Sequence, residues 1–166
     1  MIISWKHVTL VLMMALGICI LGLDSGHTSH NRGEGIEGWE KGRAYNTLYD
    51  PGYMEKLKGF VMDFKSVVPL PGMSPGTAML VRVTQGEVVT VHLGPRSFIH
   101  LNSIKIRRGD QVTVKGVWAE IDGKHVFITS QVKLDNFYVL KVRRTKDGTP
   151  YWTMSHEELA RERQLE

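Results

Sequence analysis

Residues 111–133 read QVTVKGVWAEIDGKHVFITSQVK, and this stretch decides the fold class. Polar and apolar side chains alternate on either side of Asp122-Gly123, so that Val112 and Val114 lie on one face of an extended segment. The Asp-Gly dipeptide favours the tight turn that joins two antiparallel strands. The sequence therefore predicts a β-hairpin with one face turned toward a core.

Further strands are predicted on both sides of this hairpin. Turn-forming residues recur at intervals of about 8 to 12 residues, which is typical of a sandwich or barrel. The predicted strands cover residues 59–68, 77–84, 87–93 and 137–144, with a shorter apolar segment at 104–106. Five or six strands with a longer connection near the middle predict an all-β fold, a small OB-like Greek-key barrel, with an open sandwich as the alternative.

Two short helices are predicted beside the strands. Pro51-Gly52 marks a turn, and we expect a short helix over residues 52–58 leading into the first strand. Ser155 is followed three residues later by Glu158, which is the pattern of a capping box. Residues 155–164 are therefore predicted to form a C-terminal helix.

The longest apolar run, VTLVLMMALGICILGL, extends from Val8 to Leu23. As a helix it spans about 24 Å, or about 33 Å counted from Ile2, against a hydrocarbon core of about 30 Å. We expect an uncleaved transmembrane helix rather than a cleaved signal peptide, because no triplet of small residues follows the run. Lys6 precedes the helix and favours a cytoplasmic N-terminus, with the rest of the chain in the periplasm or an organelle lumen.

The chain is expected to have four parts. These are an anchor over residues 1–23, a flexible tether over 24–44, an OB-like domain over 45–154 and a C-terminal helix and tail over 155–166. The tether is rich in Gly, Ser, His, Asn and charged residues. Cys19 is the only cysteine and lies in the anchor, so the exported domain has no disulfide.

The net charge of +4 invites comparison with nucleic-acid-binding proteins. Basic residues cluster at 105–108 and 141–146, where they are either solvated strand ends or contacts for phosphates and anionic lipid. Binding of single-stranded nucleic acid needs aromatic side chains interleaved with basic ones on one face, and Phe98, Phe127 and Phe137 are scattered. Nucleic acid is therefore a disfavoured partner.

The sequence offers little that is typical of a catalytic centre. It has no phosphate-binding glycine loop, and the neighbouring Glu157 and Glu158 do not face each other on a helix. We therefore expect a protein that is not an enzyme. The sequence indicates no particular cofactor.

His92 and His100 are the candidate metal ligands, eight residues apart across the loop that follows strand 87–93. Strand alternation places His92 opposite in phase to Val91, toward solvent or the mouth of the loop. An imidazole there could bind a metal ion or carry a proton. The alternative is a ring that hydrogen-bonds a loop carbonyl, because no carboxylate partner is in view.

Six residues are interpreted as structural. Gly94-Pro95 ends a strand because proline has no backbone N–H, and Gly109-Asp110 supplies a turn between strands. Gly116 inside a strand pattern predicts a bulge where a small barrel bends. Trp152 is predicted to cover one open end of the barrel with its large ring.

Three of these elements together resemble a known family. Residues 91–95, 109–116 and 147–152 match the patterns V-H-L-G-P, G-D-x-V-x-V-x-G and D-G-x-P-x-W, which occur in this order in a family of small exported bacterial OB-like domains. The resemblance covers residues 59–152 and extends to magnetosome membrane proteins of the MamS type. The chain departs from the family at residues 96–98, where an aromatic is usual soon after the proline, and at residues 142–144, where V-R-R replaces L-R-D.

The resemblance implies a membrane-anchored binding or assembly module outside the cytoplasm, on the bacterial inner membrane or the magnetosome, that affects magnetite crystal growth. Its expected partners are membrane lipid, through the N-terminal helix, and another exported or membrane protein. The alternative is a metal- or haem-handling accessory of an exported electron-transfer system. The His-x-x-x-Tyr pattern of exported haem chaperones is absent from the sequence.

Overall fold

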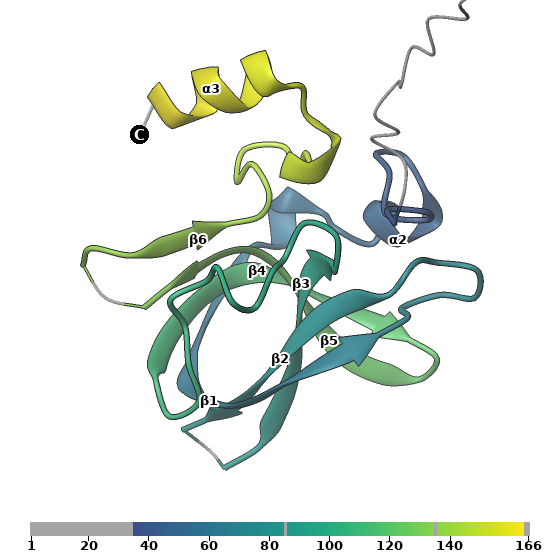
Figure 1. Cartoon of the computed structure of the whole chain (residues 1–166). Helices are drawn as coiled ribbons and strands as arrows, with labels where there is room; N and C mark the ends of the chain where they lie inside the picture. Colours follow the sequence, from purple (N-terminus) through teal and green to yellow (C-terminus); the bar gives the residue numbers. More distant parts are fainter. Residues whose placement is uncertain (1–34, 85, 135, 165–166) are drawn as a thin grey trace, which may run out of the picture. The chain divides into compact units, whose positions relative to one another are not determined.

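The computed structural model describes residues 35–84, 86–134 and 136–164 (Figure 1). The predicted anchor, residues 1–23, lies outside these residues. Among the helices that are described, none has the length and hydropathy needed to cross a membrane.

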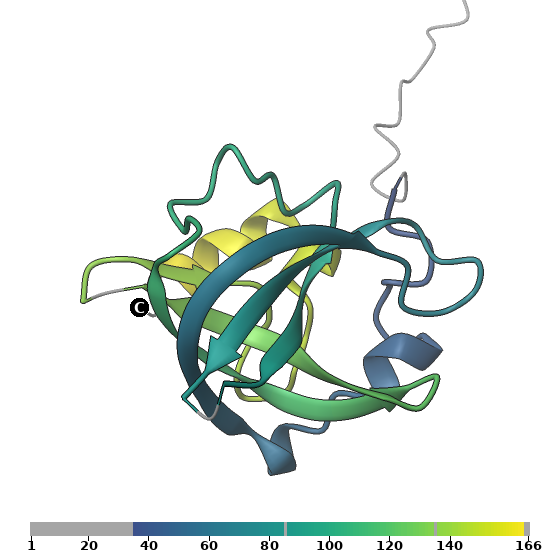
Figure 2. The same cartoon turned by 90° about the horizontal axis from the view of Figure 1, so that it is seen from below.

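Six strands form a single, mostly antiparallel sheet in the order β3-β2-β1-β4-β5-β6. Their bounds are Glu55–Val67 for β1, Gly76–Val83 for β2, Val88–Pro95 for β3, Gln111–Ile121 for β4, Lys124–Lys133 for β5 and Val139–Lys141 for β6. Strand β3 also pairs in parallel with β5, through Val91 with Phe127 and His92 with Ile128. The sheet therefore closes on itself, and Figure 2 looks down the resulting ring of β1, β2, β3, β5 and β4.

The interior of the ring is filled by apolar side chains from all five of its strands. Val61, Val81, Val91, Val114 and Phe127 are each at most 1% exposed. They come from strands with alternating burial, because successive side chains of a strand point to opposite faces. The expected all-β class with five or six strands and a C-terminal helix is confirmed, with six strands in the described residues.

Register shifts occur in three strand pairs of the ring: β4 with β5, β1 with β2, and β2 with β3, the last between Thr77 and Ala78. The pairing of β4 with β5 shifts between Lys115 and Gly116, at the position where the sequence predicts a bulge. A Cβ on Gly116 would lie 2.1 Å from the carbonyl oxygen of Ile128, so only glycine fits this close approach. The second shift lies in β1 between Val61 and Asp63 and reverses the alternation, which turns Phe64 toward the loop that follows β3.

The structure corrects the expectation for residues 35–54. Residues 35–44 were predicted as the end of a flexible tether, yet Trp39 is fully buried and donates from Nε1 to the Ser74 carbonyl oxygen over 2.8 Å. One large aromatic side chain outweighs the flexible composition around it, because burying it removes a large apolar surface from water. This segment continues into α2, Ala44–Thr47.

The helix predicted over residues 52–58 is also wrong. A 3-10 helix covers only Pro51–Tyr53, and β1 already begins at Glu55, which pairs with Gly116 of β4. Within this stretch Leu57 is buried between two exposed lysines, which is the two-residue period of a strand.

The C-terminal part follows the prediction in outline. Strand β6 has three residues rather than the predicted 137–144, because the N–H groups of Val142 and Arg143 both turn to the Ser130 carbonyl oxygen. A 3-10 helix covers Tyr151–Thr153, and α3 covers His156–Gln164. The capping box at its start is confirmed by Ser155 N–H donating to Glu158 Oε2 over 2.6 Å and Glu158 N–H donating to Ser155 Oγ over 3.1 Å.

Candidate functional site

The outer side of β3 is covered by the segment that precedes β1, and this cover buries His92. His92 is only 4% exposed, so the expectation that it faces solvent or the loop mouth is wrong. As predicted, the His92 side chain lies on the opposite face of β3 from the core residue Val91. His92 pairs with Ala78 on β2. What the sequence did not reveal is that Tyr45 of α2 packs over this face.

The His92 ring is held by one hydrogen bond. The Tyr45 hydroxyl lies 3.1 Å from Nδ1, and the two rings stack with centroids 5.9 Å apart. Burial, with a smaller contribution from the positive charge of Lys65, lowers the pKa of His92 to about 4. Burial likewise raises the pKa of Tyr45. Both groups are therefore neutral near pH 7, and His92 acts as a structural link between β3 and α2.

Arg143 is the second polar residue buried beneath this cover. It is 2% exposed, and its Cζ lies 4.8 Å from the centroid of the Trp152 ring and 5.3 Å from that of Tyr49. Its Nη1 donates to Asn46 Oδ1 over 2.6 Å and to the Gly148 carbonyl oxygen over 3.3 Å. The guanidinium therefore joins the segment before β1 to the turn after β6 through cation–π contacts and hydrogen bonds.

Trp152 lies over Gly94 near the end of β3. A Cβ on Gly94 would stand 2.7 Å from the Trp152 ring, so the close contact needs glycine. Trp152 donates from Nε1 to the Trp39 carbonyl oxygen over 2.8 Å, and its ring meets those of Trp39 and Phe98 edge to face. The ring predicted to cover an end of the barrel thus fastens the C-terminal segment to β3 and to the segment before β1.

The other predicted structural residues shape the loop between β3 and β4. The Pro95 carbonyl oxygen accepts hydrogen bonds from the N–H groups of Phe98 and Ile99, so the loop begins with a turn. At its far end Gly109 has a φ of +90°, and Asp110 Oδ2 accepts from the Arg107 N–H over 2.7 Å. The loop is thereby tied down at both ends.

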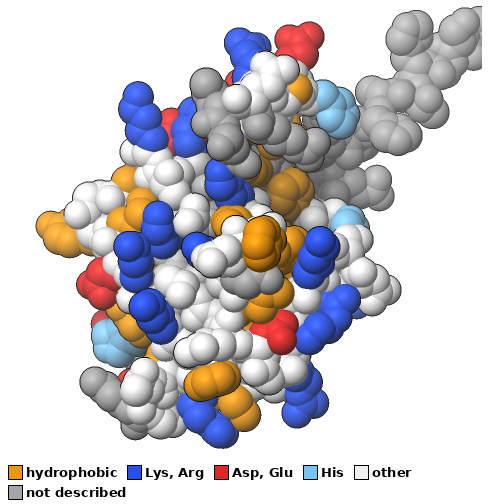
Figure 3. All heavy atoms as spheres, turned by 90° about the vertical axis from the view of Figure 1, so that its left-hand side faces the viewer, with side chains coloured by type: hydrophobic (Ala, Val, Ile, Leu, Met, Phe, Trp, Pro, Cys, Tyr) orange, Lys and Arg blue, Asp and Glu red, His pale blue; other side chains and the backbone are white. Residues whose placement is uncertain are grey.

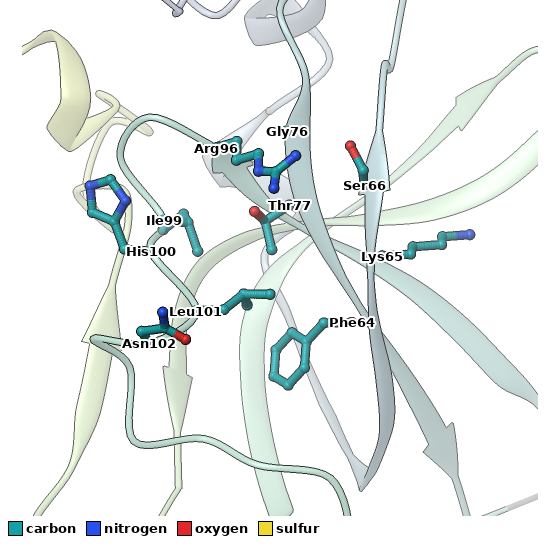
Figure 4. Close-up of a pocket in the computed structure, with 10 residues that line it drawn as sticks. All are labelled: Phe64, Lys65, Ser66, Gly76, Thr77, Arg96, Ile99, His100, Leu101 and Asn102. Carbon is teal, nitrogen blue, oxygen red and sulfur yellow. The ribbon is translucent and has the colours of Figure 1, made fainter.

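This loop forms one wall of a groove whose other wall is the end of β1. Two hollows, of about 430 and 330 Å³, share Phe64, Leu101 and Asn102 and are therefore adjacent. We call this the loop groove; Figure 4 shows its larger half. Its lining comprises Phe64, Lys65, Ser66, Gly76, Thr77, Arg96, Ile99, His100, Leu101, Asn102, Ile106, Arg107 and Arg108. Four of these residues are Lys or Arg, and this lining has no Asp or Glu.

Arg96 is the basic residue best placed to meet a ligand in the loop groove. Its side chain points into the larger hollow beside Thr77, whereas Lys65 points away and donates to Thr90 Oγ1 over 3.3 Å (Figure 4). Arg107 is occupied by the backbone carbonyl oxygens of Ile104 and Ile106. Arg96 makes no side-chain hydrogen bond or ion pair within the described part of the chain, so its charge is available.

The structure does not bring the two candidate metal ligands into one site. His100 is exposed and lines the loop groove, whereas His92 does not line it. No three His, Cys, Asp or Glu side chains are grouped to hold a metal ion in residues 35–84, 86–134 and 136–164. A metal site at His92 and His100 therefore stays a prediction.

The aromatic side chains considered for nucleic-acid stacking are unevenly exposed. Phe127 is fully buried and Phe98 packs on Trp152, whereas Phe137 is 96% exposed. The face shown in Figure 3 carries Lys and Arg side chains in dispersed positions, with fewer Asp and Glu side chains. The described Phe98, Phe127 and Phe137 therefore do not form one exposed row of stacking rings.

Comparison with known proteins supports the resemblance seen in the sequence. A family model described as the MamS/MamX magnetosome protein family matches residues 53–139, which is more than half of the chain. The match includes the V-H-L-G-P and G-D-x-V-x-V-x-G elements and ends before D-G-x-P-x-W. No curated protein matches the chain.

Proposed function

This chain belongs to the MamS/MamX magnetosome protein family, and we propose that it is a membrane-anchored, non-enzymatic binding module that uses its loop groove to hold an acidic segment of another magnetosome protein. The observation that carries this proposal is the composition of the groove. Four basic residues and the apolar side chains of Phe64, Leu101 and Ile106 line it without an acidic one.

The chemistry of the groove favours an acidic peptide with apolar side chains. Leu101 is 42% exposed and Phe64 is partly buried, so both offer apolar surface that a ligand could cover. Arg96, which lines the larger hollow beside Thr77, would pair with a carboxylate, since guanidinium binds carboxylates in a two-pronged geometry. Contact with the apolar side chains of the groove would supply affinity, and its four Lys and Arg residues would favour a negatively charged partner.

The strand connectivity supports an OB-like barrel as the scaffold. The ring closes through β3 and β5, with β1 between β2 and β4, and the first three strands follow one another as a meander. OB folds bind their ligands on one face of the barrel and on the loops beside it. The loop groove, built by the β3–β4 loop against β1, fits that arrangement.

The anchor in this proposal is the apolar run from Val8 to Leu23, which keeps the domain on one face of the inner membrane or the magnetosome membrane. Resistance of the full chain to carbonate extraction, together with a periplasmic reporter that is active only at the C-terminus, tests this placement. Release of the chain by carbonate would contradict it.

Binding is tested with the full chain in detergent and a fluorescent peptide of alternating Glu and Leu. We expect saturable binding that weakens with added salt, and a loss of about tenfold or more in affinity for Arg96→Glu, equivalent to about 1.4 kcal/mol or more. Arg82→Glu is the matched control, because Arg82 is exposed on β2 and does not line the groove. Equal losses in both variants would contradict a specific groove.

The effect on magnetite follows from the same contact. In cells that form magnetosomes, replacing the gene by its Arg96→Glu form is expected to give smaller crystals than the Arg82→Glu form at equal protein level, as measured by electron microscopy. Equal crystal sizes with the two variants would separate the groove from crystal growth.

A further inference from the structure

A small hollow lies between β5, β6 and α3, away from the loop groove. Its volume is about 130 Å³, which corresponds to roughly four water molecules of liquid. It is lined by Gln131, Lys141, Arg143, Arg144, Tyr151 and Glu162, together with Thr145. We call it the α3 hollow. Its lining has three basic side chains and one acidic one, which favours a small anion.

Arg143 brings an uncompensated charge to the α3 hollow. It is 2% exposed, and no described Asp or Glu forms an ion pair with it. Its neighbours are aromatic rings, an amide oxygen and a backbone carbonyl, all of which are formally neutral. A buried charge without a counter-charge is costly, so a bound anion would lower the free energy of this arrangement.

Two residues that line the hollow carry unpaired N–H donors. The Nε atoms of Arg143 and Arg144 are both buried and have no hydrogen-bond partner. Both residues line the α3 hollow. Buried donors in folded proteins almost always have a hydrogen-bond partner, and an ion that binds beside them can supply it.

Arg144 and Glu162 form an ion pair at one side of the hollow. Arg144 Nη2 lies 2.8 Å from Glu162 Oε1, and Arg144 Nη1 lies 3.0 Å from Asp147 Oδ2. Glu162 comes from α3, so its carboxylate occupies a position where an anion could also contact Arg144. The Glu162 carboxylate and an incoming anion would then compete for the same guanidinium.

We propose that the α3 hollow binds a small tetrahedral oxyanion of the phosphate class, held between Arg143 and Arg144. Guanidinium groups match phosphate oxygens in number and direction of N–H donors. Pockets for drug-sized ligands have volumes of about 300–1,000 Å³, so the α3 hollow accepts a phosphate group rather than a whole nucleotide. The ion would satisfy both Nε donors and neutralise Arg143.

The phosphate group could belong to the free ion or to a lipid headgroup. The two sources are distinguished with inorganic phosphate and a short-chain, water-soluble phosphatidic acid. Competition of both for one site identifies a headgroup-compatible site, whereas binding of inorganic phosphate alone identifies a site for the free ion. Either result supports the assignment of an oxyanion site.

The experiment is a calorimetric titration of the full chain in detergent with inorganic phosphate, with chloride used to hold ionic strength constant. We expect saturable binding and a melting temperature that rises with phosphate concentration, because a ligand of the folded state stabilises it by mass action. Titration with chloride alone is expected to produce neither effect.

Three variants are expected to change phosphate affinity in different ways. Arg144→Gln is expected to weaken phosphate binding about tenfold, since it removes a charged donor. Glu162→Gln is expected to tighten it about threefold or more, because the competing carboxylate is gone. Arg161→Gln is the control and should leave binding unchanged, since Arg161 is exposed on α3 and does not line the hollow.

These substitutions spare the buried Arg143, so each variant can be checked for folding before titration. The proposal is overturned if folded wild-type protein shows no saturable phosphate binding, or if Glu162→Gln weakens binding as Arg144→Gln does.

Discussion

Acid should destabilise this protein through His92. The buried ring is neutral, hydrogen-bonded to Tyr45, and has a pKa lowered to about 4, against 6.5 in an unfolded chain. Between these two values the unfolded state binds more protons than the folded state. The stability contributed by neutral His92 is therefore complete above about pH 6.5 and is lost as the pH falls toward about pH 4.

The size of the effect follows from the two pKa values. Linkage gives a loss in the free energy of unfolding of about 2 kcal/mol at about pH 5 and about 3 kcal/mol at about pH 4, relative to slightly alkaline pH. Total stabilities of domains are about 5–15 kcal/mol, so the loss is a substantial fraction. It rests on the burial of the ring, to which the charge of Lys65 adds.

The assay compares urea unfolding of the wild type and His92→Gln at about pH 8 and about pH 5. Glutamine can hydrogen-bond the Tyr45 hydroxyl but does not titrate in this range. We expect the wild type to lose about 2 kcal/mol more than the variant on acidification, because the other acid-sensitive groups are common to both. Equal losses in the two proteins would refute the claim that α2 buries a neutral His92.

Three further substitutions test the packing, each by urea unfolding. Trp39→Ala should lower the free energy of unfolding by about 3–5 kcal/mol, as truncation of a large aromatic side chain in a core does. A change below about 0.5 kcal/mol would mean that residues 35–42 form a tether. Gly94→Val should cost about 1–3 kcal/mol, because a Cβ there stands 2.7 Å from the Trp152 ring; a neutral result would place Trp152 elsewhere. Ser155→Ala should cost about 1 kcal/mol and reduce helical circular dichroism through loss of the bond to the Glu158 N–H; unchanged helicity would argue against the capping box.

The parts of the fold that depend on neighbouring residues could be predicted from the sequence. The strand over residues 111–121 was predicted with the bounds that β4 has, because alternation and the Asp122-Gly123 turn act locally. The capping of α3 by Ser155 and Glu158 is local in the same way. Closure of the ring is different, because the pairing of Val91 with Phe127 joins segments that no local pattern relates.

The site was less predictable than the fold for the same reason. The alternation of side chains along a strand predicted that His92 lies on the outer face of β3. Its burial depends on Tyr45, which is 47 residues away in the sequence. The loop groove depends on the bulge after Val61, which turns Phe64 toward Leu101. One local signal is present in the sequence: Trp39 is a large aromatic in a stretch whose glycine and charge content favour a tether.

The central claim is that the loop groove meets a specific protein partner, and photo-crosslinking in intact magnetosome-forming cells tests it most directly. A photoreactive residue would replace Asn102, which lines both halves of the groove, with the same residue at exposed Lys124, the first residue of β5, as the control. We predict one discrete protein adduct from position 102 that disappears with Arg96→Glu, and none from position 124. No adduct at position 102, or the same adducts at both positions, would contradict the claim.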